Sequence, residues 1–347
     1  MKYFFLITCC SILLSSCKQN TRKDTTKTFF LKEIKRDSAN IRAIIAVDST
    51  TLYYAGSQGR FGYTKNQGKT WTVNPITYQD TILPEFRSIA KNKTAVYVLS
   101  VGNPALLYKL ENNKHTLVYK EEHDKVFYDA LAFFSDGIHG IAVGDPTDEC
   151  PSIILTSDGG NSWSKLPCSK LPSFEDGEAF FAASNTNIKI IDSTVWIASG
   201  GKKARVLKST DKGQTWEIYD TPIIQGEGSQ GIYSIDFYDE LNGFIIGGDY
   251  SKPLDNCKNK AVTTNGGQSW KIVANNVNPN YKSCVQYIPN SNGKELVAIG
   301  KTGVSYSKDG GSSWTEVSKD AYYTIQFTND YSAWLAGHQK IGQLTIK

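Results

Sequence analysis

Short apolar segments that end in glycine recur along the chain at nearly regular intervals. They are apolar at successive positions instead of alternating, which is typical of strands packed between two other sheets. The seven segments are 53–56, 98–102, 141–144, 196–200, 244–248, 296–300 and 334–337. A second apolar segment precedes each of them, and these are 42–46, 87–90, 128–132, 178–182, 233–237, 282–286 and 323–327. The pattern predicts an all-β protein built from seven similar units.

A polar eight-residue motif follows five of these strand pairs, starting at residues 64, 156, 209, 263 and 307. Each copy has a hydroxyl residue, an Asp or Asn, a glycine and a final tryptophan, a combination that favours a tight hairpin turn. Because Asn replaces Asp in two copies, the motif is predicted to be structural. Its key residues are Asn66, Trp71, Asp158, Trp163, Asp211, Trp216, Asn265, Trp270, Asp309 and Trp314. A degenerate sixth copy is expected at 108–115.

The motif resembles the Asp-box, or BNR repeat, of β-propeller proteins. With seven units, the chain resembles Asp-box propellers of the photosystem II assembly and stability factor type, and more distantly the sialidase superfamily. The resemblance to the assembly factors implies a binding scaffold that catalyses no reaction. Their own partner is not transferred, because one fold serves many functions.

Seven units over residues 29–347 average about 46 residues, the length of a four-stranded propeller blade. We therefore predict one seven-bladed propeller, with six blades as the alternative. The last unit lacks its outer strand after 343–346, and residues 28–34 are expected to supply it and close the ring.

The first 28 residues differ from the rest. Residues 1–16 read as an export signal with one Lys and an apolar run too short to span a bilayer. The Leu-Ser-Ser-Cys sequence ending at Cys17 resembles a bacterial lipobox, which implies lipidation of Cys17; an ordinary signal peptide is the alternative. Residues 17–28 then form a polar tether, and residues 29–347 the propeller. We expect a monomeric lipoprotein of the bacterial cell envelope, anchored on the periplasmic side or at the outer membrane.

Four cysteines remain outside the signal, an even number that favours disulfides in an exported chain. The order of the strands places all four on the face opposite the boxes and favours the pairs Cys150–Cys168 and Cys257–Cys284. Four buried free thiols are the alternative. The net charge of +4 comes largely from the N-terminal segment, so no basic face for nucleic acid is expected. The four histidines lack metal-ligand spacing, and neither metal nor cofactor is predicted.

The inner strands begin on the face opposite the boxes, around the central axis. We predict that a ring of residues at this channel mouth binds an anionic or sugar-like ligand or an envelope protein. The ring consists of Arg42, Arg87, Tyr128, Asp129, Glu178, Tyr233, Lys282 and Tyr323. Loops on the same face add charged residues that include Asp145 and Lys301. A solvated mouth without a ligand is the alternative.

Two enzyme classes are the alternatives to a scaffold. A sialidase or other glycoside hydrolase would need two carboxyl groups at the pocket floor about 5–9 Å apart. The candidates are Tyr128 or Tyr233 with Glu178 as the nucleophile pair, and Asp129 as the acid. An oxidoreductase would rest on the glycine pattern at 226–231, but this segment precedes a strand and lacks the helix that such a motif requires.

Overall fold

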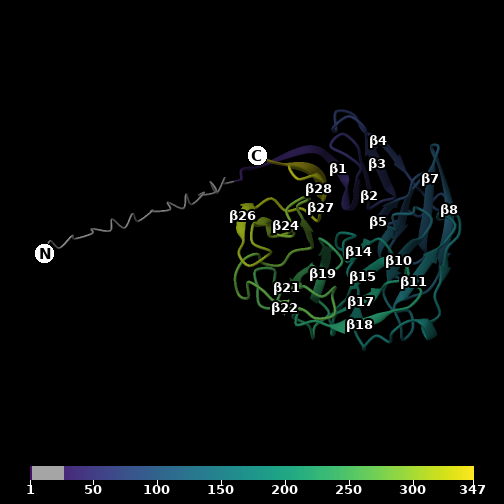
Figure 1. Ribbon diagram of the computed structural model, residues 1–347. Helices are drawn as coiled ribbons and strands as arrows, with labels where there is room; N and C mark the ends of the chain where they lie inside the picture. Colours follow the sequence, from purple (N-terminus) through teal and green to yellow (C-terminus); the bar gives the residue numbers. More distant parts are fainter. Residues whose placement is uncertain (2–26) are drawn as a thin grey trace.

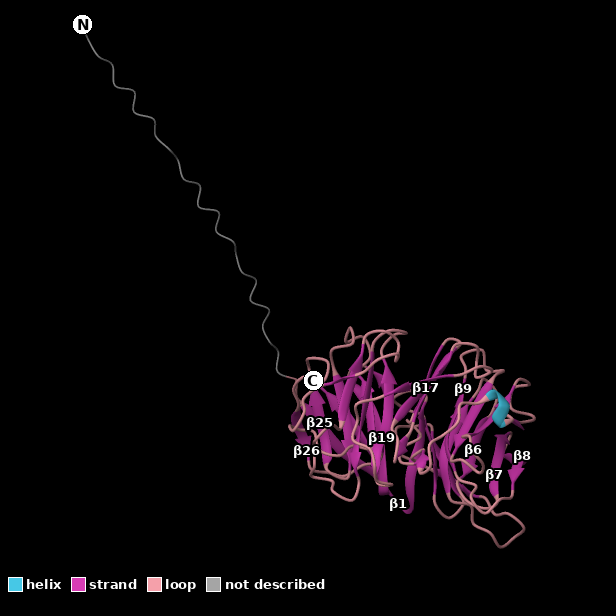
Figure 2. Cartoon of the chain, turned by 90° about the horizontal axis from the view of Figure 1, so that it is seen from below, coloured by secondary structure: helices cyan, strands magenta, loops and turns pink. Residues whose placement is uncertain are grey.

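The strands of the chain form a ring of sheets around a central axis (Figure 1). The computed structural model describes Met1 and residues 27–347. Seen edge-on, the strands run between two faces made of loops (Figure 2). Within the described residues the structure contains one short helix, the 3-10 turn η1 (Cys168–Lys170). The prediction of an all-β propeller is confirmed.

Four of the sheets have four strands each, in the order of the chain. One four-stranded sheet contains β5 (Phe86–Lys91), β6 (Val96–Ser100), β7 (Ala105–Glu111) and β8 (Lys114–Glu121). The next contains β9 (Tyr128–Phe133), β10 (Gly140–Gly144), β11 (Ser152–Thr156) and β12 (Ser164–Lys165). A third contains β14 (Ile188–Ile191), β15 (Thr194–Ala198), β17 (Arg205–Ser209) and β18 (Glu217–Asp220). A fourth contains β23 (Cys284–Tyr287), β24 (Leu296–Gly300), β25 (Gly303–Ser307) and β26 (Thr315–Ser318).

Two further sheets have six strands each. One contains β13 (Glu178–Ala179), β16 (Gly200–Gly201), β19 (Gln230–Phe237), β20 (Gly243–Asp249), β21 (Lys260–Thr263) and β22 (Lys271–Ile272). The other contains β27 (Thr324–Asn329), β28 (Ser332–Ile346), β1 (Phe29–Ala46), β2 (Leu52–Gly56), β3 (Arg60–Thr64) and β4 (Thr72–Pro75).

The number of sheets corrects the prediction of seven separate blades. Counted as continuous hydrogen-bonded sheets, the blades of residues 27–347 number six, which was the alternative. The reason is β1, whose first part pairs with β28 from Phe29–Ile346 to Asn40–His338 and whose second part, from Ile41, pairs with β2. The last and the first predicted units therefore share one sheet. The expected pairing of the two ends of the chain is confirmed, and it closes the ring.

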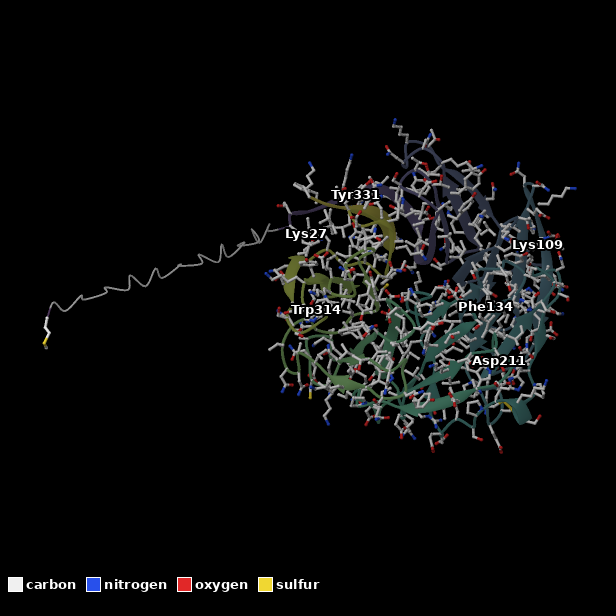
Figure 3. The ribbon with its side chains drawn as sticks, in the orientation of Figure 1. Lys27, Lys109, Phe134, Asp211, Trp314 and Tyr331 are labelled. Atoms are coloured by element: carbon white, nitrogen blue, oxygen red, sulfur yellow. A yellow bond between two sulfur atoms is a disulfide. The ribbon has the colours of Figure 1, made fainter. Side chains whose placement is uncertain are left out.

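The five Asp-boxes form the hairpin turns between the two outer strands of their units. In the first, the Gly68 amide donates to Thr64 Oγ1 at 3.0 Å and the Thr70 amide donates to Asn66 Oδ1 at 2.9 Å. Trp71 Nε1 then donates to the Gly68 carbonyl at 3.0 Å. Equivalent bonds recur in the other four boxes, two of which are marked by Asp211 and Trp314 in Figure 3. These bonds account for a structural role of the boxes. The degenerate copy is also a turn, at Asn112 and Asn113, between β7 and β8.

The inner strand of the fourth unit departs from the predicted strand at 178–182. Only Glu178 and Ala179 lie in a strand, and β14 resumes at Ile188. The intervening residues 180–187, which we call the axial segment, leave the sheet and bond to strands around the ring. Thr324 Oγ1 donates to the Ser184 carbonyl at 3.1 Å, and Ser184 Oγ donates to the Ser283 carbonyl at 2.7 Å.

The next residues of the axial segment continue these contacts. Thr186 Oγ1 lies 2.7 Å from Ser234 Oγ, and Asn185 Nδ2 donates to the Ile89 carbonyl at 2.9 Å. Asn185 Oδ1 accepts the Leu131 amide at 2.9 Å. The segment thus ties β5, β9 and β19 together across the axis.

One of the two predicted disulfides is present. Cys150 and Cys168 are bonded, with a Cα–Cα distance of 5.5 Å. The predicted Cys257–Cys284 bridge is wrong, because both thiols are free. Cys284 is fully buried at the start of β23, and packs with Tyr322 and Ile325 of the next unit. Cys257 lies instead in a partly exposed loop.

The predicted export signal, the lipidation site Cys17 and most of the tether lie outside the described residues. Among the described residues, no helix is long and apolar enough to cross a membrane.

Candidate functional site

A pocket of about 380 Å³ opens at the axis, on the face opposite the Asp-boxes. Its lining combines three cations with seven aromatic rings and includes no carboxylate. The lining residues are Arg42, Arg87, Phe127, Phe180, Phe181, Ala182, Ala183, Tyr233, Tyr250, Tyr281, Ser283, Lys301 and Tyr323. We call it the arginine–aromatic pocket. The structure thus places four members of the predicted ring, Arg42, Arg87, Tyr233 and Tyr323, around one cavity.

β-bulges position three of these four side chains. The pairing of β1 with β2 skips Arg42, that of β5 with β6 skips Arg87, and that of β19 with β20 skips Tyr233. A bulged residue is left out of the ladder and bends the strand locally, which re-aims its side chain. The three inner strands therefore present their bulged side chains to the pocket.

The two arginines carry little compensating negative charge. Arg42 Nη1 donates to the Ala183 carbonyl at 3.2 Å, and its guanidinium lies 4.1 Å from the centre of the Tyr323 ring. Burial and the neighbouring charge of Arg87 lower the pKa of Arg42. Arg87 contacts one carboxylate, Glu85, at 3.4 Å. Because like charges in a partly buried site repel, this arrangement favours an anionic ligand.

Aromatic rings form another wall of the pocket. Phe181 and Tyr233 are stacked with their centres 4.0 Å apart, and Tyr281 meets Tyr233 edge-on at 4.8 Å. Lys301 Nζ lies 5.7 Å from the Tyr281 ring and donates to the Tyr250 carbonyl. Burial raises the pKa of Tyr233 and Tyr281, so both phenols stay neutral. The wall suits an apolar or planar group next to an anion.

The axial segment contributes part of the pocket lining. Ala182 and Ala183 line it, and both are nearly fully buried. A second cavity lies elsewhere along the segment, lined by Asn185, Thr186 and the inner strands.

The other four members of the predicted ring do not line the pocket. Tyr128 is fully buried and donates to Glu121 at 2.7 Å. Glu178 forms a buried ion pair with Arg205 at 2.5 Å. Lys282 is also buried and donates to the Gly303 carbonyl at 2.8 Å, and burial lowers its pKa to about 8.

The fourth of these residues, Asp129, occupies the bulge of β9 and is fully buried. Burial and the nearby Asp145 raise its pKa, against the effect of Arg87. Neither carboxylate oxygen makes a hydrogen bond of ordinary geometry. The lining of the pocket therefore offers no pair of carboxyl groups for glycoside hydrolysis within the described residues.

Sequence reasoning missed several residues of the pocket by one position. Phe127 lines it in place of Tyr128, and Tyr281 in place of Lys282. The sequence signal for Phe127 and Tyr281 is that each stands next to a predicted residue. The sequence does not show the register at the ends of the strands, which decides which of the two neighbours lines the pocket. Phe181 and Ala182 belong to the predicted strand 178–182, which the structure does not form beyond Ala179, and Ala183 follows them directly. No cluster of three metal-ligating side chains occurs in the described part of the chain.

Comparisons with known proteins establish similarity of fold. No protein-family model and no curated protein matches the sequence. A solved structure described as YCF48 bound to D1 peptide superposes with a TM-score of 0.65 at 14% identity, covering 91% of this chain and 94% of that chain. YCF48 from Cyanidioschyzon merolae gives a TM-score of 0.60 at 12% identity, with 91% and 98% covered. The WD40 repeats of RRP9 give 0.64 at 10% identity, with 91% and 97% covered. At these identities the similarity shows a β-propeller fold alone.

Proposed function

We propose that this chain is a non-catalytic binding or assembly scaffold that holds an anionic segment of another protein in the arginine–aromatic pocket. The observation that carries the proposal is the pair Arg42 and Arg87, both partly buried in one pocket with one carboxylate in contact. A ligand carboxylate would relieve their mutual repulsion and accept hydrogen bonds from both guanidinium groups.

The comparisons support a protein ligand over a small sugar. One similar propeller was solved with a peptide bound, and WD40 propellers are also similar. The aromatic wall offers apolar area beside the cations, which is the composition of many peptide-binding surfaces. The glycoside hydrolase alternative gains no support from the lining of the pocket, and Glu178 is held by Arg205.

Selection from a display library of random peptides tests the proposal. The affinity of the enriched peptides is then measured for the wild type, for Arg42→Ala/Arg87→Ala and for the control variant Lys65→Ala/Lys69→Ala. The control removes the same charge from two exposed residues of an Asp-box turn. We expect acidic peptides, with affinity reduced at least about tenfold by the arginine variant and unchanged in the control. Peptides that bind both variants equally would refute the site.

We also propose that lipidated Cys17 and a polar tether anchor the propeller to a bacterial envelope membrane. The sequence up to Cys17 is the support for this. Cell fractionation of the wild type and of Cys17→Ser, with mass spectrometry of the N-terminal peptide, tests it. We expect acylation and membrane association of the wild type alone; an unmodified Cys17 would contradict the proposal.

A further inference from the structure

A third hollow, of about 540 Å³, lies next to the arginine–aromatic pocket. Its charged lining residues are mainly acidic, and we call it the acidic cleft. They include Asp145, Asp148, Glu149, Glu175, Asp176 and the single cation Lys125. Two loops supply most of these residues and are joined by a bond from the Phe174 amide to the Glu149 carbonyl at 3.0 Å. The Cys150–Cys168 disulfide fixes the end of the first loop.

The pocket and the cleft share one wall. The Asp145 amide donates to the Phe127 carbonyl at 2.8 Å, and Asp145 Oδ1 accepts the Phe180 amide at 2.7 Å. Phe127 and Phe180 line the pocket, whereas Asp145 lines the cleft. A ligand that fills one hollow and continues past this wall therefore enters the other.

One carboxylate of the cleft, the buried Glu178, is paired with Arg205, whereas the others have few cationic partners. Within residues 27–347, no salt bridge includes Asp145, Asp148, Glu149 or Glu175. Asp176 has only a 3.6 Å contact between exposed side chains, with Lys202.

Asp129 is a buried carboxyl group close to both hollows. It is fully buried, its carboxylate oxygens lack hydrogen-bond partners, and it interacts electrostatically with both Arg87 of the pocket and Asp145 of the cleft. Burial and the nearby Asp145 raise the pKa of Asp129, which favours its neutral form. The negative charge on the cleft side of the wall therefore comes from exposed carboxylates, and the positive charge on the pocket side comes from Arg42, Arg87 and Lys301.

We propose that the pocket and the cleft together bind one extended, internal segment of a partner protein, with acidic side chains in the pocket and lysine or arginine side chains in the cleft. This inference rests on the proposed function and adds the order of charges in the ligand. Opposite charges in separate hollows fix the direction and register of a bound chain, because the reversed segment would place like charges together.

Two capped peptides of about ten residues and identical composition test the inference. One has its glutamates and lysines in separate blocks, and the other alternates them; capping removes the terminal charges. We expect the block peptide to bind the full chain at least about tenfold more tightly in fluorescence anisotropy. Glu149→Gln/Glu175→Gln, at two exposed positions, should abolish this difference. The matched variant Glu240→Gln/Asp330→Asn, exposed on the opposite face, should preserve it.

Equal affinities for the two peptides, or a block preference that survives Glu149→Gln/Glu175→Gln, would overturn the inference. A third peptide, of glutamates without lysines, separates this outcome from failure of the proposed function. If that peptide binds and Arg42→Ala/Arg87→Ala abolishes its binding, the pocket is a binding site and the cleft takes no part. If no acidic peptide binds, the proposed function fails as well.

Discussion

Replacement of Asn185 tests whether the axial segment holds the inner strands together. Its side chain makes two bonds of 2.9 Å, to the Ile89 carbonyl and from the Leu131 amide. A hydrogen bond of this kind contributes about 1 kcal/mol net, so Asn185→Gly should lower the free energy of unfolding by about 2 kcal/mol. Asn185 also has a φ of 60°, a left-handed conformation that costs alanine about 1 kcal/mol. Asn185→Ala should therefore lose about 3 kcal/mol.

Urea unfolding followed by tryptophan fluorescence measures these differences. Asn290→Ala is the control, because Asn290 has a φ of 59° on the exposed surface and should lose only the backbone contribution of about 1 kcal/mol. If Asn185→Ala and Asn290→Ala lose the same free energy, the side-chain bonds of the axial segment do not stabilise the ring, and the reasoning is refuted.

Three further perturbations have defined outcomes. Cys150→Ser/Cys168→Ser opens a loop with a sequence separation of 18 and should lower the free energy of unfolding by about 3 kcal/mol, with no added effect of reductant; no loss would contradict the bridge. The Asp37 side chain is fully buried and accepts bonds from Lys35 at 2.6 Å and Arg60 at 3.1 Å, so Asp37→Ala should lower the free energy of unfolding by about 3 kcal/mol in chemical denaturation. A neutral result would exclude this ion-pair cluster as a stabilising element. Burial raises the pKa of Asp145 to about 6, so folding favours its protonated form and the free energy of unfolding falls as pH rises from about 4 to 6. Relative to the wild type, the free energy of unfolding of Asp145→Asn should rise by up to about 3 kcal/mol over this range. A difference that does not change with pH would show that Asp145 titrates normally.

The apolar pattern predicts the strands well because each strand is buried on both faces by its neighbours. All seven glycine-ending segments lie wholly or largely in strands, and the pairing of β1 with β28 follows from the missing outer strand of the last unit. The merging of two units into one sheet does not follow from the pattern, since it depends on β1 continuing through a bulge between Ile41 and Ala43.

The candidate site is predicted less completely for the same physical reason. A bulge shifts the side-chain direction by one residue and leaves no mark in the hydrophobic pattern. Arg42 and Arg87 occupy bulges and line the pocket, whereas Lys282 precedes β23, which pairs with β24 without a bulge, and does not line the pocket. The axial segment begins with apolar residues that read as strand. Its polar residues find their partners on distant strands, as Ser184 does with Ser283, and such contacts are not local in sequence.

Hydrogen–deuterium exchange of the full chain, with and without a peptide recovered by selection, tests the central claim most directly. The claim is that ligands enter the pocket between Arg42 and Arg87. We predict slower exchange in the peptides that contain Phe127, Ala182–Ala183 and Tyr281, and unchanged exchange in the Asp-box turns. Protection of the box turns, with no change around the pocket, would contradict the account.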